Sequence, residues 1–111
     1  GTPAAFAGDP QALAAARQIV ARGWDRDVPP VHRAFCYLPF EHSESADDQQ
    51  ESLRLFAQLQ REPGVGDVFE WALKHQVIIE RFGRFPHRNA ILGRPSTDEE
   101  LAFLAQPGSS F

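Results

Sequence analysis

The sequence predicts an all-α chain of four to five helices, arranged as an antiparallel array of helical hairpins. Residues that start and stop helices recur five times along the 111 residues. Between these residues, apolar side chains follow the 3.6-residue period of an amphipathic helix. Strand signals are almost absent, because the best candidate, residues 77–79, lies inside a longer helical pattern. These three observations together favour helices and no sheet.

The first two predicted helices begin near residues 9 and 31. Asp9 and Pro10 give the first helix an N-cap followed by a proline in its first turn, and Gly23 ends it. The buried face of this helix is expected to consist of Leu13, Ala16, Ile19 and Val20. The second helix, residues 31–40, is apolar on every side, so we expect it to be central. Pro39 either ends this helix or kinks it, because proline lacks a backbone N–H.

The third predicted helix starts at a variant of the capping box, formed by Ser45 and Asp48, and ends at residues 63–64. Its buried stripe is expected to be Leu53, Phe56 and Leu59. The last helix is short and begins at a second capping box, made of Thr97 and Glu100. Leu101, Phe103 and Leu104 are expected to pack that helix.

The fourth predicted helix runs from an N-cap at Asp67 to Phe82, with Gly83 as a left-handed terminator. One face of this helix carries Val68, Trp71, Ala72, His75, Ile79 and Phe82. We expect this face and residues 31–40 to form the core.

Composition limits the class of protein. The hydrophobic fraction of 42% suits one globular domain, which we place at residues 1–106, followed by a loose tail at 107–111. The net charge of −4 argues against binding to nucleic acid, and no apolar run is long enough to span a membrane. Cys36 is the only cysteine, which excludes an internal disulfide and fits a reducing compartment. We therefore expect a cytoplasmic location.

A first group of polar residues follows Pro39. Glu41, His42 and Glu44 emerge together at the end of the apolar second helix. The partial negative charge at a helix C-terminus favours a protonated His42, which makes His42 and Glu44 candidate acid/base residues. The alternative is that His42 and Glu44 satisfy nearby backbone groups and cap the next helix.

A second group lies in the arginine-rich segment 81–94. Candidate ligand-binding residues there are Arg84, His87, Arg88 and Asn89, interleaved with Phe82, Phe85 and Pro86, and Glu41 of the first group is a further ligand-binding candidate. Guanidinium groups bind carboxylate or phosphate in a bidentate manner, and phenylalanine rings can hold them rigid. The alternative is that the phenylalanines anchor the core while the arginines are solvated or pair with the acidic third helix.

Charge predicts that these two groups meet. Residues 41–70 carry a net charge of −6 and residues 71–95 a net charge of +4. We therefore expect Arg84, His87, Arg88 and Asn89 to turn toward Glu41, His42 and Glu44 and to form one polar cluster near the end of the central helix.

The remaining polar candidates indicate packing rather than chemistry. His75 lies on an apolar face and is expected to be a hydrogen-bonded core histidine, whereas His32 suits the surface. The four histidines include no pair at helical spacing, so we predict no metal site and no cofactor. Cys36 lies among bulky apolar residues and is expected to be inert packing.

Several segments resemble one bacterial family, catalogued as domain of unknown function 924. The resemblance rests on residues 1–6, 37–44, 81–89, 93–94 and 97–104 and covers nearly the whole chain. It implies a tetratricopeptide-like helical fold and no assigned activity. Family members are longer, with an N-terminal portion that ends in an Asp-Gln-Phe-Pro-Arg-Asn motif similar to residues 84–89. The resemblance therefore implies that this chain is a C-terminal portion.

Two classes of function stay open. The first is a binding or interaction module whose Arg/His/Glu cluster holds a peptide or a small anionic ligand. The second is an enzyme that uses His42 and Glu44 as acid/base groups while Arg84 and Arg88 hold an anionic substrate. If upstream helices are missing, part of the apolar face of residues 11–22 or 31–40 is uncovered, and we expect self-association or low stability.

Overall fold

The computed structural model describes residues 6 and 8–109, and every regular element within that part of the chain is helical. The α-helices are α1 (Asp9–Ala21), α2 (Pro30–Glu41), α3 (Ala46–Leu59), α4 (Val68–Phe82), α5 (Asn89–Leu92) and α6 (Asp98–Leu104). Short 3₁₀ turns lie at Trp24–Asp27 and Pro86–Arg88. The predicted all-α fold is confirmed, and residues 77–79 lie inside α4. The helix that the sequence did not predict is the four-residue α5.

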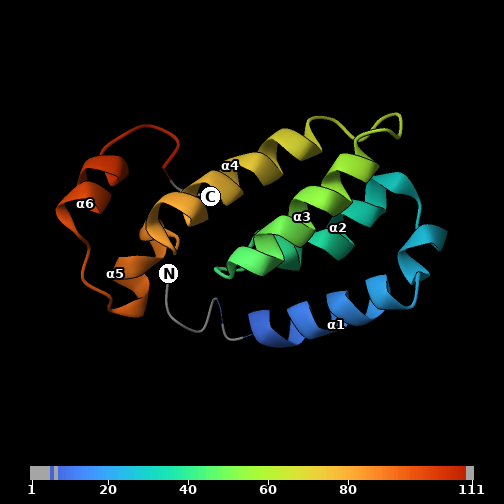
Figure 1. Ribbon diagram of the computed structural model, residues 1–111, viewed down its shortest axis with the longest axis horizontal. Coiled ribbons are helices and arrows are strands. Elements are labelled where there is room, and N and C mark those ends of the chain that lie inside the picture. Colours follow the sequence, from blue (N-terminus) through green and yellow to red (C-terminus); the bar gives the residue numbers. More distant parts are fainter. Residues whose placement is uncertain (1–5, 7, 110–111) are drawn as a thin grey trace.

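Helices α1 to α4 form the body of the molecule. Consecutive helices run in alternating directions, and α3 packs between α2 and α4 (Figure 1). Helix α2 also contacts α1 and α4, so its predicted central position is confirmed. The core of the body is formed by Ala16, Tyr37, Phe40, Leu55, Phe56, Leu59 and Ala72.

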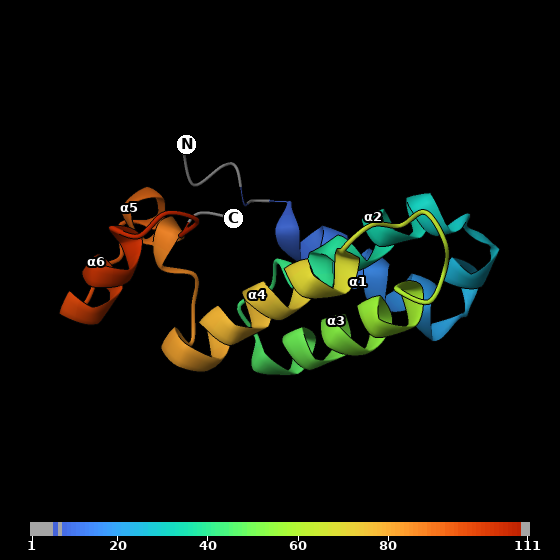
Figure 2. The same cartoon turned by 90° about the horizontal axis from the view of Figure 1, so that it is seen from above.

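The C-terminal lobe, residues 84–109, packs at the far end of α4 (Figure 2). A second hydrophobic cluster holds it there, with Ile78, Ile79 and Phe85 buried and Phe82 and Phe103 packed against them. Ser109 is buried in this lobe and donates a hydrogen bond to the carbonyl of Leu104 at 3.2 Å. The last two residues of the predicted tail, 110–111, lie outside the described residues.

The predicted helix ends are partly confirmed. Gly83 ends α4 with a positive φ of 73°, a conformation that side chains with a Cβ rarely adopt. Thr97 begins α6 with a complete capping box: its hydroxyl accepts from the Glu100 N–H at 3.1 Å, and its own N–H donates to Glu100 Oε1 at 2.9 Å. Ser45 and Asp67 do occupy N-cap positions, but neither side chain caps its helix.

Two details of the predicted caps are wrong. Asp9 is the first residue of α1, and the N-cap is Gly8. At the start of α3, Asp48 does not complete a capping box with Ser45, because its carboxylate accepts from the Ser43 hydroxyl at 2.7 Å and from Arg17 at 2.7 Å. Both donors come from segments outside α3, so the local sequence pattern does not reveal them.

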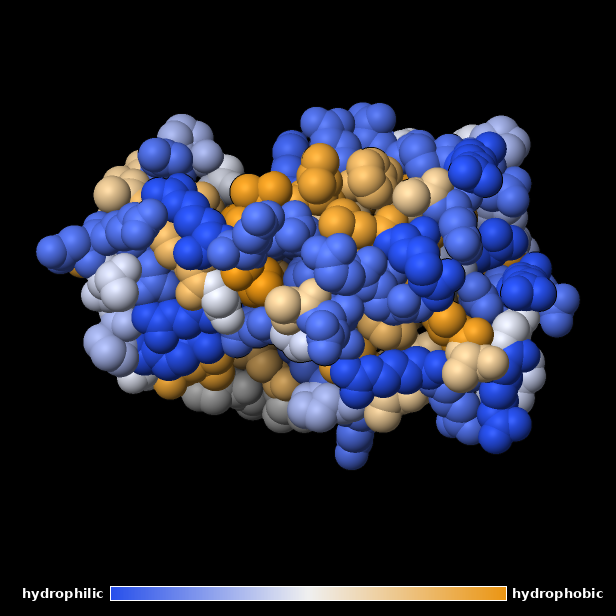
Figure 3. Space-filling model, in the orientation of Figure 1, coloured by the Kyte–Doolittle hydropathy of each residue, from blue (hydrophilic) through white to orange (hydrophobic). Residues whose placement is uncertain are grey.

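The prediction that residues 31–40 and the Trp71 face of α4 form the core is only partly confirmed. Val31 and Phe35 on α2 are 60% and 67% exposed, and Trp71 on α4 is 53% exposed. Helix α2 buries the sides that face α1, α3 and α4, whereas Val31 and Phe35 lie on an outer side that stays exposed. Hydrophobic side chains therefore remain at the surface, including Leu73 and Val77 on α4, where Figure 3 shows them gathered. On α3, Leu55 is buried, whereas Leu53 of the predicted stripe is half-buried.

No helix in the described part of the chain is long and apolar enough to cross a lipid bilayer.

Candidate functional site

The two polar groups predicted from the sequence meet where the end of α2 touches the C-terminal lobe. The backbone N–H of Phe85 donates to Glu44 Oε2 at 2.6 Å, although the two residues are 41 positions apart. Arg88 Nη2 donates to the backbone carbonyl of His42 at 2.8 Å. These contacts join the segment after Pro39 to the arginine-rich segment.

The carboxylate of Glu44 is bound by Arg94. Arg94 Nη1 and Nη2 donate to Glu44 Oε1 and Oε2 at 2.9 and 3.1 Å, and Arg94 also donates to the carbonyl of Phe85 and to Asn89 Oδ1. Burial raises the pKa of Glu44, but the hydrogen bonds from Arg94 and from the Phe85 N–H outweigh it and hold that pKa below its ordinary value. The ionised carboxylate of Glu44 therefore links the body to the lobe.

Arg84 binds Glu100 instead of the carboxylates after Pro39, which corrects part of the predicted cluster, whereas Asn89 reaches the junction through Arg94. Arg84 binds Glu100 in a bidentate manner, with its Nε and Nη2 at 2.8 and 2.7 Å from the carboxylate oxygens. Buried Asn89 donates to Ser96 Oγ at 3.0 Å and lies 3.4 Å from Glu100. The capping box at Thr97 orients Glu100 toward both residues, so they hold α6 inside the lobe. The hydrogen bonds from Arg84 lower the pKa of Glu100 to about 2.

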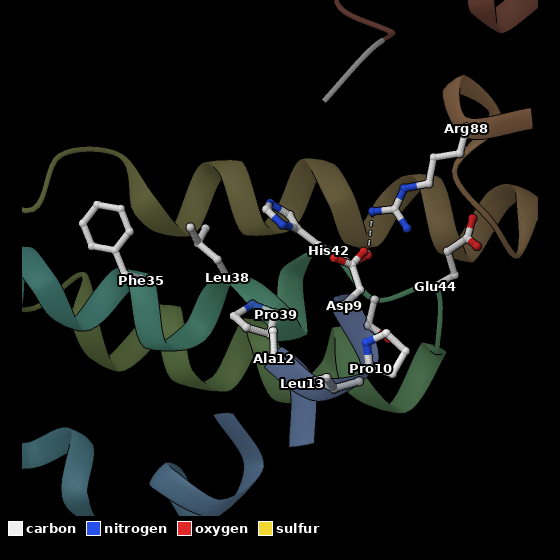
Figure 4. Close-up of a pocket in the computed structure, with 11 residues that line it drawn as sticks. Asp9, Pro10, Ala12, Leu13, Phe35, Leu38, Pro39, His42, Glu44 and Arg88 are labelled. Atoms are coloured by element: carbon white, nitrogen blue, oxygen red, sulfur yellow. Dashed lines mark hydrogen bonds between the residues drawn. The ribbon is translucent and has the colours of Figure 1, made fainter. Parts of the chain in front are cut away.

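Three adjoining hollows share His42, which caps the C-terminal end of α2 and is exposed at their common edge. We call the three together the central groove. The first hollow, of about 420 Å³, lies between α1 and α2 (Figure 4). Its lining consists of Asp9, Pro10, Ala12, Leu13, Phe35, Leu38, Pro39, His42, Ser43, Glu44 and Arg88.

The second hollow, of about 320 Å³, lies between α2 and α4 and is bordered by Trp71, His75 and Glu41. The third, of about 350 Å³, lies against the C-terminal lobe. Its lining consists of Phe6, Asp9, His42, His75, Phe85, His87, Arg88 and Ile91. The central groove therefore has walls from the body and from the lobe.

Arg88 differs from the other arginines of its segment. Its guanidinium lies 4.7 Å from the ring centres of Phe6 and of Phe85, and it borders the first and third hollows. Among the described residues, no carboxylate forms an ion pair with Arg88, and its buried Nε has no hydrogen-bond partner. Burial lowers the pKa of Arg88, with Glu44 and Asp9 acting in the opposite direction. In Figure 4 the guanidinium reaches back over the end of α2.

Three imidazoles line the third hollow together with Arg88. The rings of His42 and His75 lie 5.7 Å apart, and Phe85 lies 5.7 Å from His75 and 5.8 Å from His87. Desolvation lowers the pKa of His42, an effect that Glu41 opposes and that His75 and Arg88 reinforce. Desolvation and the charge of Arg88 likewise lower the pKa of His87.

His75 is a buried, hydrogen-bonded histidine, as predicted. Its Nδ1 lies 2.8 Å from the carbonyl of Trp71 and 3.1 Å from Oε1 of Glu41, which is itself buried. His75 also borders two of the hollows, which its position on an apolar helix face did not indicate. In the part of the chain that the structure covers, no group of His, Cys, Asp and Glu side chains is arranged to hold a metal ion.

The chain matches, over residues 1–108, the model of a family described as bacterial protein of unknown function, DUF924. The chain belongs to the DUF924 family. A solved structure of a protein of unknown function from Agrobacterium tumefaciens is similar to this DUF924 chain, with a TM-score of 0.86 and 43% sequence identity. The alignment covers 95% of this chain and 57% of that protein, so the chain spans less than two thirds of its length. No curated protein matches.

Proposed function

We propose that this DUF924 chain is a binding module, which holds the anionic group of a peptide or of a small ligand in the central groove. The observation that supports the proposal is Arg88: a half-buried guanidinium, stacked between two rings and open to two hollows, with no ion pair among the described residues. A charge-assisted hydrogen bond to such a group contributes roughly 1.5–3 kcal/mol.

The other arginines of the segment already form ion pairs with carboxylates of the protein. Arg84 binds Glu100 and Arg94 binds Glu44, each through two nitrogen atoms. The stacking of Arg88 on Phe6 and Phe85 restricts its side chain before any ligand arrives, which lowers the entropy cost of binding.

The apolar part of the groove indicates the rest of the ligand. Leu13, Phe35 and Leu38 line the first hollow beside Arg88. A ligand that joins an apolar body to an anionic end satisfies both parts of the surface, as is typical of small-molecule sites. Benzoate has both features and is a suitable probe.

The test compares Arg88→Gln with Arg81→Gln by following backbone amide chemical shifts during titration with benzoate. Arg81 is a matched control, because it stacks on Phe82 at 4.6 Å but borders none of the three hollows and pairs with Glu99 at the surface. We expect shifts at residues 38–44 and 85–91, weakened about tenfold in Arg88→Gln, equivalent to about 1.4 kcal/mol, and unchanged in Arg81→Gln. Equal binding by the two variants contradicts the proposal.

The alternative, an enzyme that uses His42, Glu44, Arg84 and Arg88, remains a hypothesis. Both carboxylate oxygens of Glu44 already accept hydrogen bonds, and Arg84 is anchored to Glu100. Only His42 and Arg88 of the four face the groove with donors to spare, so the geometry favours binding over acid/base catalysis.

Three further predictions stay proposals. The helical-hairpin packing of α1 to α4 supports a tetratricopeptide-like arrangement. The single free thiol of Cys36 supports a cytoplasmic location. The exposed Val31 and Phe35 support self-association through the outer side of α2.

A further inference from the structure

We infer that the central groove selects a tetrahedral oxyanion of the sulfate or phosphate type over a planar carboxylate, and that the bound oxyanion draws a proton onto His42. The inference rests on the proposed function, because it assigns a ligand class to the same site.

The donors around the third hollow come from separate parts of the fold. Arg88 and His87 belong to the Pro86–Arg88 turn, and His42 belongs to the end of α2. A carboxylate accepts hydrogen bonds best in its own plane, where a single guanidinium fork satisfies it. A tetrahedral oxyanion presents acceptors in three dimensions, and therefore suits donors that approach from different segments.

His42 is the histidine best placed to respond to the charge of the ligand. Its ring borders all three hollows, whereas among the described histidines His75 borders two and His87 one. A neutral imidazole offers one N–H donor, but a protonated imidazole offers two and carries a positive charge. Protonation of His42 therefore adds both a donor and an attractive charge at the place where the hollows meet.

The charged groups that face His42 come from four elements: Asp9 of α1, Glu41 of α2, His75 of α4 and Arg88 of the Pro86–Arg88 turn. Without a ligand, desolvation, His75 and Arg88 outweigh the two carboxylates and lower the pKa of His42. An anion bound beside Arg88 offsets the charge of that arginine, so the pKa of His42 rises when the ligand binds.

The direction in which the affinity depends on pH follows from the rise in the pKa of His42 on ligand binding. The bound state holds its proton to a higher pH than the free state, so at neutral pH binding takes up a proton. Affinity therefore increases as the pH falls, and becomes constant once His42 is protonated in the free protein as well. The steepest slope that one proton allows is about tenfold in Kd per pH unit.

Sulfate is the probe for the experiment, because it is tetrahedral and does not titrate between about pH 8 and about pH 5.5. Its Kd is measured on the full chain at constant ionic strength, alongside that of benzoate. The His42 imidazole resonances are followed against pH with and without sulfate. We expect sulfate to bind more tightly than benzoate, with a Kd that falls at least about threefold per pH unit below about pH 7.5.

Two variants separate His42 from the other histidines. His42→Gln keeps a hydrogen-bonding side chain at an exposed position but cannot be protonated, so the pH slope of its sulfate Kd is expected to fall to less than half that of the unmodified chain, with the remainder due to His87. His32→Gln is the matched control, because His32 is exposed and borders none of the three hollows. It should retain the pH slope of the unmodified chain. The imidazole titration of that chain needs no variant, and so it tests the inference even where a variant folds poorly.

The outcomes distinguish the inference from the proposed function. A sulfate Kd that depends on Arg88 but not on pH, or tighter binding of benzoate than of sulfate, overturns the inference and leaves the binding module in place. If neither anion binds in a manner that depends on Arg88, both are overturned.

Discussion

The buried carboxylate of Glu100 gives the sharpest test of how the C-terminal lobe is held together. Its side chain is 2% exposed and accepts both hydrogen bonds of Arg84 and the N–H of Thr97. The substitution Glu100→Gln preserves the size of the side chain and one oxygen for Thr97. It removes the negative charge beside Arg84, and thus isolates the ion pair from the cap.

The expected loss of stability follows from the two hydrogen bonds between Arg84 and Glu100, whose acceptor is no longer ionised in Glu100→Gln. Each charge-assisted hydrogen bond contributes roughly 1.5–3 kcal/mol, but the two share one guanidinium that is 27% exposed, so their sum is reduced. We expect Glu100→Gln to lower the free energy of unfolding by about 2–3 kcal/mol at neutral pH. Since the carboxyl has a folded pKa of about 2 and an ordinary value of 4.5, its contribution is complete above the ordinary value. That contribution is lost as the pH falls through the folded pKa.

The assay is urea unfolding followed by far-UV circular dichroism at about pH 7 and at about pH 2.5. Glu99→Gln is the matched control, because Glu99 is adjacent on α6 and pairs with Arg81, yet is 64% exposed. A surface pair of this kind contributes about 0–0.5 kcal/mol. Equal effects of the two substitutions at neutral pH, or an effect of Glu100→Gln that does not shrink in acid, would refute the reasoning.

Two further substitutions test other parts of the fold. Gly83→Ala places a Cβ on a residue with φ of 73° and no crowding neighbour within 4 Å, so only backbone strain is added. We expect thermal unfolding to show a loss of about 1 kcal/mol in stability, and an unchanged Tm would contradict this. Phe35→Ser removes a side chain that is 67% exposed, so the free energy of unfolding should change by no more than about 0.5 kcal/mol, while self-association measured by sedimentation velocity weakens. Equal self-association of the variant and the unmodified chain would count against an apolar contact through α2.

Local signals predicted the ends of the helices best. The glycine at position 83 and the capping box at Thr97 each depend on a few neighbouring residues, and both are found in the structure. Ser45 has the same kind of local signal but no side-chain cap, and its capping box is incomplete because the Asp48 carboxylate binds Ser43 and Arg17 while the Ser45 N–H donates to Ser43 Oγ. A local pattern thus marks where a helix begins, whereas distant residues decide which hydrogen bonds form there.

The candidate site was predicted as a meeting of two segments but not as a set of partners. The opposite charges of residues 41–70 and 71–95 indicated attraction, and the contact between Glu44 and the arginine-rich segment exists. Net charge does not specify which arginine binds which carboxylate. Two left-handed glycines precede these arginines, Gly83 before Arg84 and Gly93 before Arg94, and the fold brings Arg84 to Glu100 and Arg94 to Glu44.

Burial was the least predictable property. Trp71 and His75 lie on the same face of α4 by sequence, yet His75 is buried and Trp71 is 53% exposed. The apolar pattern of a helix shows which side is hydrophobic, but the neighbouring helices determine how much of that side is covered. The outer side of α2, with Phe35, illustrates the same limit.

The position of the central groove between two hydrophobic clusters has a consequence for cooperativity. The third hollow has walls from the body, including His42 and His75, and from Phe85, His87 and Arg88 of the lobe, so this part of the groove exists only while the lobe is docked. A ligand that binds there recognises the docked state alone, and by mass action stabilises it by about 2.7 kcal/mol at a concentration one hundred times its Kd. Amide hydrogen exchange in α6, which lines none of the three hollows, then slows in proportion, so that protection of the lobe reports occupancy of the groove.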